Sequence, residues 1–152
     1  MFSFLKKKPV FFSEKENELI VAAIKSAEQR TSGEVRVYVE SHCRFMDAMD
    51  RAIEVFHGLR MHETADRNAV LVYVAMKDHQ LAIYGDEGIH SKVGTEFWNK
   101  ELKLMLSAFN RNNHAEGIAT VVKEIGEVLV EHFPYNKETD KNELPDDIVF
   151  GR

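Results

Sequence analysis

The chain has 152 residues, of which 44% are hydrophobic and 30% are charged, a balance typical of one folded domain and not of a disordered chain. It carries 20 Lys and Arg against 25 Asp and Glu, a net charge of −5 without a basic stripe, which argues against general nucleic-acid binding. A single cysteine, Cys43, excludes an internal disulfide and a zinc site built from cysteines.

Residues 1–12 are expected to form an N-terminal arm. Phe2, Phe4 and Leu5 stand before the lysines at 6–8, which is the reverse of signal-peptide order. No run of residues approaches the roughly 18 apolar positions of a transmembrane helix, so we expect a cytoplasmic protein with no transmembrane segment. The arm could touch an anionic membrane surface, or it could be flexible or packed back on the domain.

The first elements of the main domain, predicted over residues 13–134, are a helix and a strand. Ser13 and Glu16 fit a capping box, apolar residues follow at helical spacing, and the segment 31–33 (Thr-Ser-Gly) ends the helix. Residues 34–40 (EVRVYVE) alternate strictly, which predicts a strand with its valines on one face.

A second helix is expected from Asp47 to about Arg60, followed by a second strand. This strand, between Asn68 and Met76, is apolar on both faces, so it should lie buried between two layers. A short turn at residues 77–79 should return the chain as an antiparallel partner.

The rest of the chain is predicted as a strand, a loop, two helices and a tail. The hairpin partner spans residues 80–84, and Gly85-Asp86-Glu87-Gly88 is expected to be a loop. Helices are expected from Thr95 to about Phe109 and from about His114 to His132. Residues 135–152 hold few apolar anchors and are expected to be a flexible C-terminal tail.

The order of these elements predicts an α/β fold. The strand–helix–strand segment should make its two strands parallel, and the hairpin should add an antiparallel strand. We therefore expect a three-layer α/β/α sandwich, with a small mixed β-sheet flanked by helices on both faces.

The hairpin brings three carboxylates to one end of the sheet. If Met76 faces Gln80, then Asp66 before one strand lies near Asp86 and Glu87 after the other. Three carboxylates on such loops form a candidate metal site for a hard cation, Ca²⁺ or Mg²⁺, with carbonyls of the Gly85–Gly88 loop as further ligands. His62 and Glu63 would come within reach. The alternative is that Asp66 caps a turn and that the other two carboxylates are solvated.

Other chemical motifs are weak. His42-Cys43-Arg44 follows the first strand, where α/β folds often bind ligands, but the arginine spacing of cysteine phosphatases is absent, so Cys43 is more simply structural. The sequence contains no His-Glu-x-x-His zinc motif, no P-loop, no dinucleotide fingerprint and no Gly-x-Ser-x-Gly elbow.

Several segments together resemble the TPM domain family. They are Thr31-Ser-Gly-Glu-Val-Arg-Val37, Asp66-Arg-Asn-Ala-Val-Leu-Val-Tyr-Val74, Ala82-Ile-Tyr-Gly-Asp-Glu-Gly-Ile89, Phe97-Trp98 and Ala115-Glu-Gly-Ile118. The match covers about residues 13–134, and the chain is most similar to the short, soluble bacterial members. The resemblance implies an α/β/α sandwich, and it implies Ca²⁺ binding or acid phosphatase activity, since both are described for relatives.

Two functions from different classes follow. The first is a divalent-cation (Ca²⁺ or Mg²⁺) binding interaction module that could act with a protein partner at the membrane, with Asp66, Asp86 and Glu87 holding the metal. The second is a metal-assisted acid phosphatase acting on phosphomonoesters, in which a further carboxylate or His62 serves as base. Whether the chain is an enzyme stays open at this point, and no catalytic residue is assigned.

Overall fold

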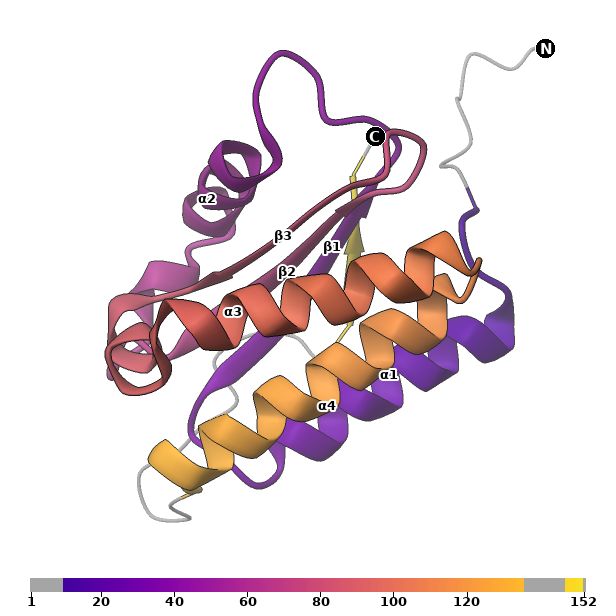
Figure 1. The fold of residues 1–152 in the computed structure, drawn as a ribbon. Coiled ribbons are helices and arrows are strands. Elements are labelled where there is room, and N and C mark those ends of the chain that lie inside the picture. Colours follow the sequence, from indigo (N-terminus) through magenta and orange to yellow (C-terminus); the bar gives the residue numbers. More distant parts are fainter. Residues whose placement is uncertain (1–9, 136–146, 152) are drawn as a thin grey trace, which may run out of the picture.

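A computed structural model describes residues 10–135 and 147–151 of the chain. Its elements follow one another as α1 (Glu14–Glu28), β1 (Glu34–Glu40), α2 (Ala48–Gly58), the short 3₁₀ helix η1 (Met61–Glu63), β2 (Ala69–Ala75), β3 (Gln80–Gly85), α3 (Glu87–Asn110), α4 (His114–His132) and β4 (Ile148–Phe150) (Figure 1).

The strands form one mixed sheet in the order β3-β2-β1-β4. β1 runs parallel to β2 and to β4, whereas β2 and β3 form an antiparallel hairpin. The predicted parallel pair and the predicted hairpin are therefore both confirmed.

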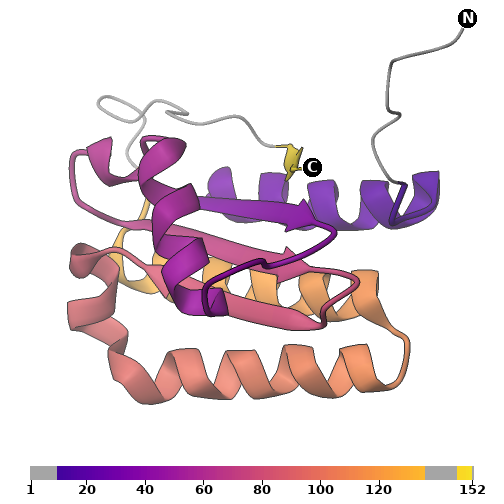
Figure 2. The same ribbon diagram turned by 90° about the horizontal axis from the view of Figure 1, so that it is seen from above.

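Helices cover both faces of this sheet, as the two ribbon views show (Figures 1 and 2), and the predicted α/β/α sandwich is confirmed. α1, α3 and α4 pack on the face that carries the alternate valines of β1 and β2, namely Val35, Val37, Val39, Val70, Val72 and Val74. α2 packs on the opposite face, against Leu71, Tyr73 and Ala75 of β2. Because β2 lies between these layers, all of its residues are buried, which explains why its sequence is apolar at odd and even positions alike.

The predicted capping box at the start of α1 is also confirmed. The hydroxyl of Ser13 accepts a hydrogen bond from the N–H of Glu16 at 3.1 Å, and the Glu16 carboxylate accepts one from the N–H of Ser13 at 2.8 Å. These two bonds satisfy N–H groups that have no partner inside the helix, so the helix begins where the sequence indicates.

The register of the hairpin differs by one residue from the prediction. Ala75, and not Met76, lies opposite Gln80. The N–H of Met76 donates to the carbonyl of Glu40 at 2.8 Å, so this residue still pairs with the end of β1. The turn therefore has one residue more than predicted, and His79 closes it in a left-handed conformation with a φ of 51°.

The segment after β3 becomes helical earlier than predicted. Asp86 is the N-cap of α3, and its carboxylate accepts a hydrogen bond from the N–H of Glu87 at 2.8 Å. The predicted loop over residues 85–88 is thus the end of β3 followed by the first turn of a helix. Gly94, with a φ of 77°, interrupts α3, and the helix predicted from Thr95 is its second half.

Parts of both predicted end segments pack on the domain. Ile148–Phe150 form β4 beside β1, so the predicted flexible tail over residues 135–152 does not hold for this strand. Phe12 is 4% exposed, and its ring lies 6.4 Å from that of Phe150, which places it in the core and not in the arm predicted over residues 1–12. Most of these two segments, namely residues 1–9, 136–146 and 152, lies outside the described residues.

Among the described residues, 10–135 and 147–151, no helix combines the length and the apolar character needed to cross a bilayer. The cytoplasmic location that the sequence suggests stays a prediction.

Candidate functional site

The loop before β2 and the first turn of α3 meet at the amino end of the parallel strands. The N–H of Gly88 donates to the carbonyl of Arg67 at 2.8 Å. A Cβ atom on Gly88 would lie 2.1 Å from the carbonyl oxygen of Asp66, so this approach of two backbones requires glycine. The structure thus brings residues 66–68 and 86–88 together, as predicted, although the hairpin register is shifted.

The carboxylate of Asp86 is held by the guanidinium of Arg67. Nε of Arg67 lies 2.7 Å from one carboxylate oxygen of Asp86 and Nη2 lies 2.9 Å from the other, a bidentate pair. Asp86 is 1% exposed, whereas the Arg67 side chain is 42% exposed. The hydrogen bonds to Asp86 raise the pKa of Arg67, so the guanidinium stays charged. Asp86 is therefore neither a solvated charge nor an open ligand in this conformation.

The other two predicted ligands are exposed. Glu87 contacts the same guanidinium, with 3.3 Å between its carboxylate and Nη1 of Arg67. Asp66 lies on the surface, with its backbone against Gly88. Within the part of the chain that the structure describes, no group of three or more His, Cys, Asp or Glu side chains is arranged to hold a metal ion. The carboxylates of Asp86 and Glu87 do converge, but on the guanidinium of Arg67.

Arg67 is the residue of this site that the sequence reasoning missed. Its backbone is left-handed, with a φ of 51°, because the loop turns sharply before β2. The N–H of Asn68 donates to the hydroxyl of Thr64 at 3.2 Å and the N–H of Arg67 to the Thr64 carbonyl at 3.2 Å, so Thr64 fixes the turn. The only feature of the sequence that could have indicated its role is its position directly after Asp66, one of the predicted ligands.

His62 and Glu63, predicted to come within reach, lie in η1 just before this loop. Glu63 pairs with Arg60, with 2.9 Å between Nε and the carboxylate, and this hydrogen bond lowers the pKa of Glu63. Nδ1 of His62 is buried and has no hydrogen-bond partner among the described residues. His62 thus has an unsatisfied polar atom near the loop, and so does Asn68 in the loop itself, whose buried Oδ1 also lacks a partner among the described residues.

A second polar cluster, which the sequence reasoning also missed, lies at the opposite end of β1. Glu40, whose side chain is 5% exposed, accepts two hydrogen bonds from the guanidinium of Arg51 on α2, each 2.9 Å long. The phenol of Tyr73 donates to the same carboxylate. This cluster joins α2 to the sheet, and each of its groups is already engaged by another.

The loop after β1 is fixed by Asp78 of the hairpin turn. The Asp78 carboxylate accepts a hydrogen bond from the N–H of Cys43 at 2.7 Å and lies 2.8 Å from Nδ1 of His42. The hydrogen bond with His42 is the largest of the effects that lower the pKa of Asp78. The thiol of Cys43 donates to the carbonyl of Met46 at 3.3 Å, in agreement with the structural role expected for this cysteine.

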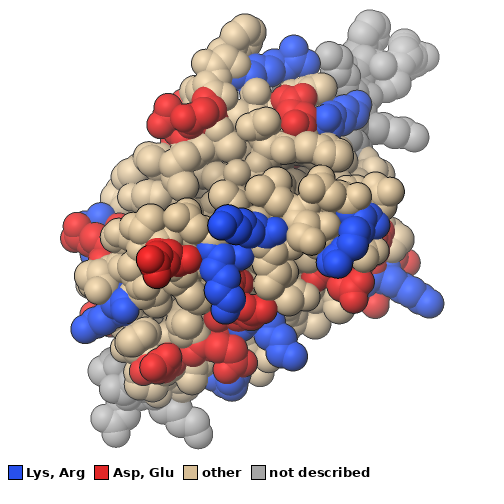
Figure 3. All heavy atoms as spheres, in the orientation of Figure 1, with Lys and Arg blue, Asp and Glu red and all other residues tan. Residues whose placement is uncertain are grey.

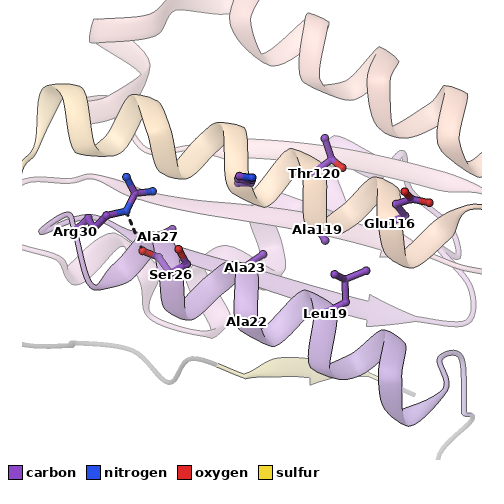
Figure 4. Close-up of a pocket in the computed structure, with 10 residues that line it drawn as sticks. Leu19, Ala22, Ala23, Ser26, Ala27, Arg30, Glu116, Ala119 and Thr120 are labelled. Carbon is purple, nitrogen blue, oxygen red and sulfur yellow. Dashed lines mark hydrogen bonds between the residues drawn. The ribbon is translucent and has the colours of Figure 1, made fainter.

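Away from both clusters, a shallow groove runs between α1 and α4 (Figure 4). Its floor consists of small residues of both helices, and Arg30 at one end donates to the carbonyl of Ser26 at 3.3 Å. Gly126 allows the close helix contact below it, because a Cβ there would lie 2.6 Å from that of Ala27. The surface beyond is mixed in charge, with acidic and basic side chains interspersed on the face shown in Figure 3. The groove presents no convergent set of catalytic side chains.

The comparisons with known proteins agree with this fold. The family model described as the TPM domain, which carries the name TPM_phosphatase, matches residues 7–128. The chain belongs to the TPM domain family. No match is found among curated proteins.

Two solved structures resemble this TPM domain. The NMR structure of BA42 protein from the psychrophilic bacterium Bizionia argentinensis is 39% identical, with a TM-score of 0.85 over 95% of this chain and 99% of that one. The N-terminal domain of cg2496 protein from Corynebacterium glutamicum is 15% identical, with a TM-score of 0.59 over 84% of this chain and 88% of that one, a likeness of fold alone. Two of the segments that carried the family resemblance, 66–74 and 82–89, form the loop, the hairpin strands and the helix start that meet at Arg67.

Proposed function

We propose that this TPM domain is a divalent-cation-binding interaction module, with Ca²⁺ or Mg²⁺ held by Asp66, Asp86 and Glu87. The observation that carries the proposal is the Arg67 guanidinium, which serves as the counter-ion of the buried Asp86 and also contacts Glu87. A buried carboxylate requires a positive partner, and a divalent cation meets that requirement as an arginine does.

The oxygen donors of this loop suit a hard cation in their chemistry, but Arg67 must leave before Asp86 can bind one. Its side chain is 42% exposed and can turn toward solvent without unfolding the loop. The conformation described above would then be the cation-free form. Cation binding would place a free guanidinium on the surface, and this change of surface charge is what a protein partner at the membrane would recognise.

Competition between Arg67 and the cation gives a direct test. We expect Ca²⁺, and more weakly Mg²⁺, to cause saturable amide shifts confined to residues 62–68 and 85–90 in NMR titrations of the metal-free full chain. In Arg67→Gln the affinity should rise roughly tenfold, because the competing charge is gone. Asp66→Asn and Glu87→Gln should weaken binding.

Arg60→Gln is the matched control, because Arg60 also pairs with a carboxylate close to the loop but does not touch Asp86. It should bind the cation as the natural chain does. Flat spectra in both the natural chain and Arg67→Gln, or weaker binding in Arg67→Gln, would remove the basis of the proposal.

A metal-assisted phosphatase is the second candidate, favoured by His62 and by the name of the family model. The buried, unpartnered Nδ1 of His62 suits a general base that awaits a substrate or a water. If the domain is a phosphatase, turnover of p-nitrophenyl phosphate should need Ca²⁺ or Mg²⁺ and should be lost in both Asp66→Asn and His62→Gln. A cation-binding module without catalysis should show no turnover above that of the buffer, and metal-independent turnover would contradict both candidates.

A further inference from the structure

The outer face of α1 and α4 combines one large apolar side chain with many small ones. The two helices run side by side in the same direction, and the groove between them is the one shown in Figure 4. Leu19, toward one end of this groove, is 47% exposed. Most of the other lining residues are small, namely Ala22, Ala23, Ser26, Ala27, Ala119 and Thr120. Such short side chains allow another helix to approach closely.

Four exposed charged side chains lie on this face as two matching pairs. Glu18 and Lys25 are seven residues apart on α1, and Glu116 and Lys123 are seven residues apart on α4. Seven residues make about two helical turns, so the two members of a pair point to the same side of their helix. In both pairs the carboxylate comes first. The face is therefore acidic toward the helix starts and basic toward the helix ends at these four positions.

The midpoints of the two pairs lie at nearly the same level along the groove. The midpoint of the α1 pair is beside Ala22, and the midpoint of the α4 pair is between Ala119 and Thr120. All three of these residues line the groove. Arg30 pairs with Glu127 at 3.4 Å, which fixes how far one helix is displaced along the other and brings the two midpoints close to one level.

We propose that this face binds a second copy of the chain in a symmetric dimer. A two-fold axis that crosses α1 and α4 at the shared level reverses the direction of the helices in the partner. Glu18 then meets Lys25 of the partner subunit, and Glu116 meets Lys123 of the partner subunit. A contact of this symmetry must be complementary to itself, and the two pairs of charges are. Leu19 would pack over the small side chains of the opposing helix.

The four charges are available for this contact. Neighbouring charges on the same helices are paired within the chain, Arg30 with Glu127 and Glu124 with Lys100. None of the four forms an ion pair with another residue that the structure describes. The net charge of −5 makes two copies repel each other at long range, so association depends on this local pairing and should be weak.

Sedimentation equilibrium of the full chain tests whether the dimer forms. We expect association at low salt that is evident when the protein concentration reaches about 1 mM. High salt should weaken it, because ion pairs near the surface are screened. Leu19→Ser should weaken it roughly tenfold, because an apolar contact is lost from the interface.

Charge reversal tests the symmetry of the contact. One double variant, Glu18→Lys with Glu116→Lys, makes all four positions positive, and the other, Lys25→Glu with Lys123→Glu, makes them all negative. Either variant alone should associate more weakly by roughly a hundredfold or more, because like charges would face each other. An equal mixture of the two variants should form a heterodimer, since every facing pair is then opposite in sign.

The control is Lys92→Glu with Lys103→Glu, which reverses two exposed lysines of α3 and changes the net charge as the second double variant does. It should associate as the natural chain does. A natural chain that stays monomeric at low salt and about 1 mM overturns the proposal and leaves the groove to a helix of another protein. Dimers of either reversed variant alone, or a mixture that does not associate although circular dichroism shows both variants folded, would overturn the proposed symmetry.

Discussion

Replacing Glu101 by glutamine is expected to stabilise the folded protein by about 3 kcal/mol at pH 8, and to change its stability by less than about 1 kcal/mol at pH 5. Glu101 is completely buried between α3 and α4, and neither of its carboxyl oxygens has a hydrogen-bond partner among the described residues. Burial, followed by the neighbouring carboxyl group of Glu124, raises the pKa of Glu101 from 4.5 to about 7.

The direction of the pH effect follows from that raised pKa. Below pH 4.5 the Glu101 carboxyl is protonated in both the folded and the unfolded chain, and its contribution to stability is fully present. Between pH 4.5 and about 7 the unfolded chain releases the proton while the folded chain keeps it, so stability falls as the pH rises. Above about pH 7 the full cost of a buried charge beside Glu124 is reached. Glutamine carries no charge at any pH, so this cost is absent in Glu101→Gln.

Urea unfolding at several pH values between 5 and 8 measures this difference. Glu96→Gln is the matched control, since Glu96 lies on the same helix with its side chain in solvent, and it should follow the natural chain at every pH. If the difference in the free energy of unfolding between Glu101→Gln and the natural chain stays constant from pH 5 to pH 8, then Glu101 does not hold a proton that the unfolded chain releases.

The sheet and its helices could be predicted because burial leaves a periodic trace in the sequence. Val35, Val37 and Val39 alternate along β1 because only one of its faces meets α1 and α4, and β2 is apolar throughout because both of its faces are covered. β4 leaves no such trace. It is three residues long, and Ile148, 6% exposed, is its one buried side chain, so its place beside β1 depends on a contact distant in sequence.

The candidate site could be predicted only as a meeting of two segments. Antiparallel pairing places residues 66–68 near residues 86–88 whichever of two adjacent registers holds. Which groups pair there depends on side-chain directions, and the left-handed turn at Arg67 directs its guanidinium onto Asp86. The early start of α3 could not be predicted for a related reason. Glycine is a poor helix former, and Gly88 stands in this helix because the backbone of the loop leaves no room for a Cβ atom.

Replacing Arg51 by methionine is expected to destabilise the protein by about 3 kcal/mol, toward the lower end of the range for broken buried ion pairs because Arg51 is partly exposed. Its guanidinium is the positive partner of Glu40, whose side chain is 5% exposed. Burial raises the pKa of Tyr73, and its hydrogen bond to Glu40 adds to the effect, so the phenol remains a donor. One neutral donor cannot replace a bidentate guanidinium, and Arg51→Met would leave a buried negative charge.

Urea unfolding of a double-mutant cycle separates the unpaired charge from lost packing. Adding Glu40→Gln to Arg51→Met removes the charge, so the double variant should be more stable than Arg51→Met alone. Arg60→Met is the control: its ion pair with Glu63 is of equal length, but both side chains are exposed, and no measurable loss is expected. A double variant no more stable than the single one would mean that Arg51 acts by packing over the ring of Tyr38, 5.9 Å away, and not as the counter-ion of Glu40.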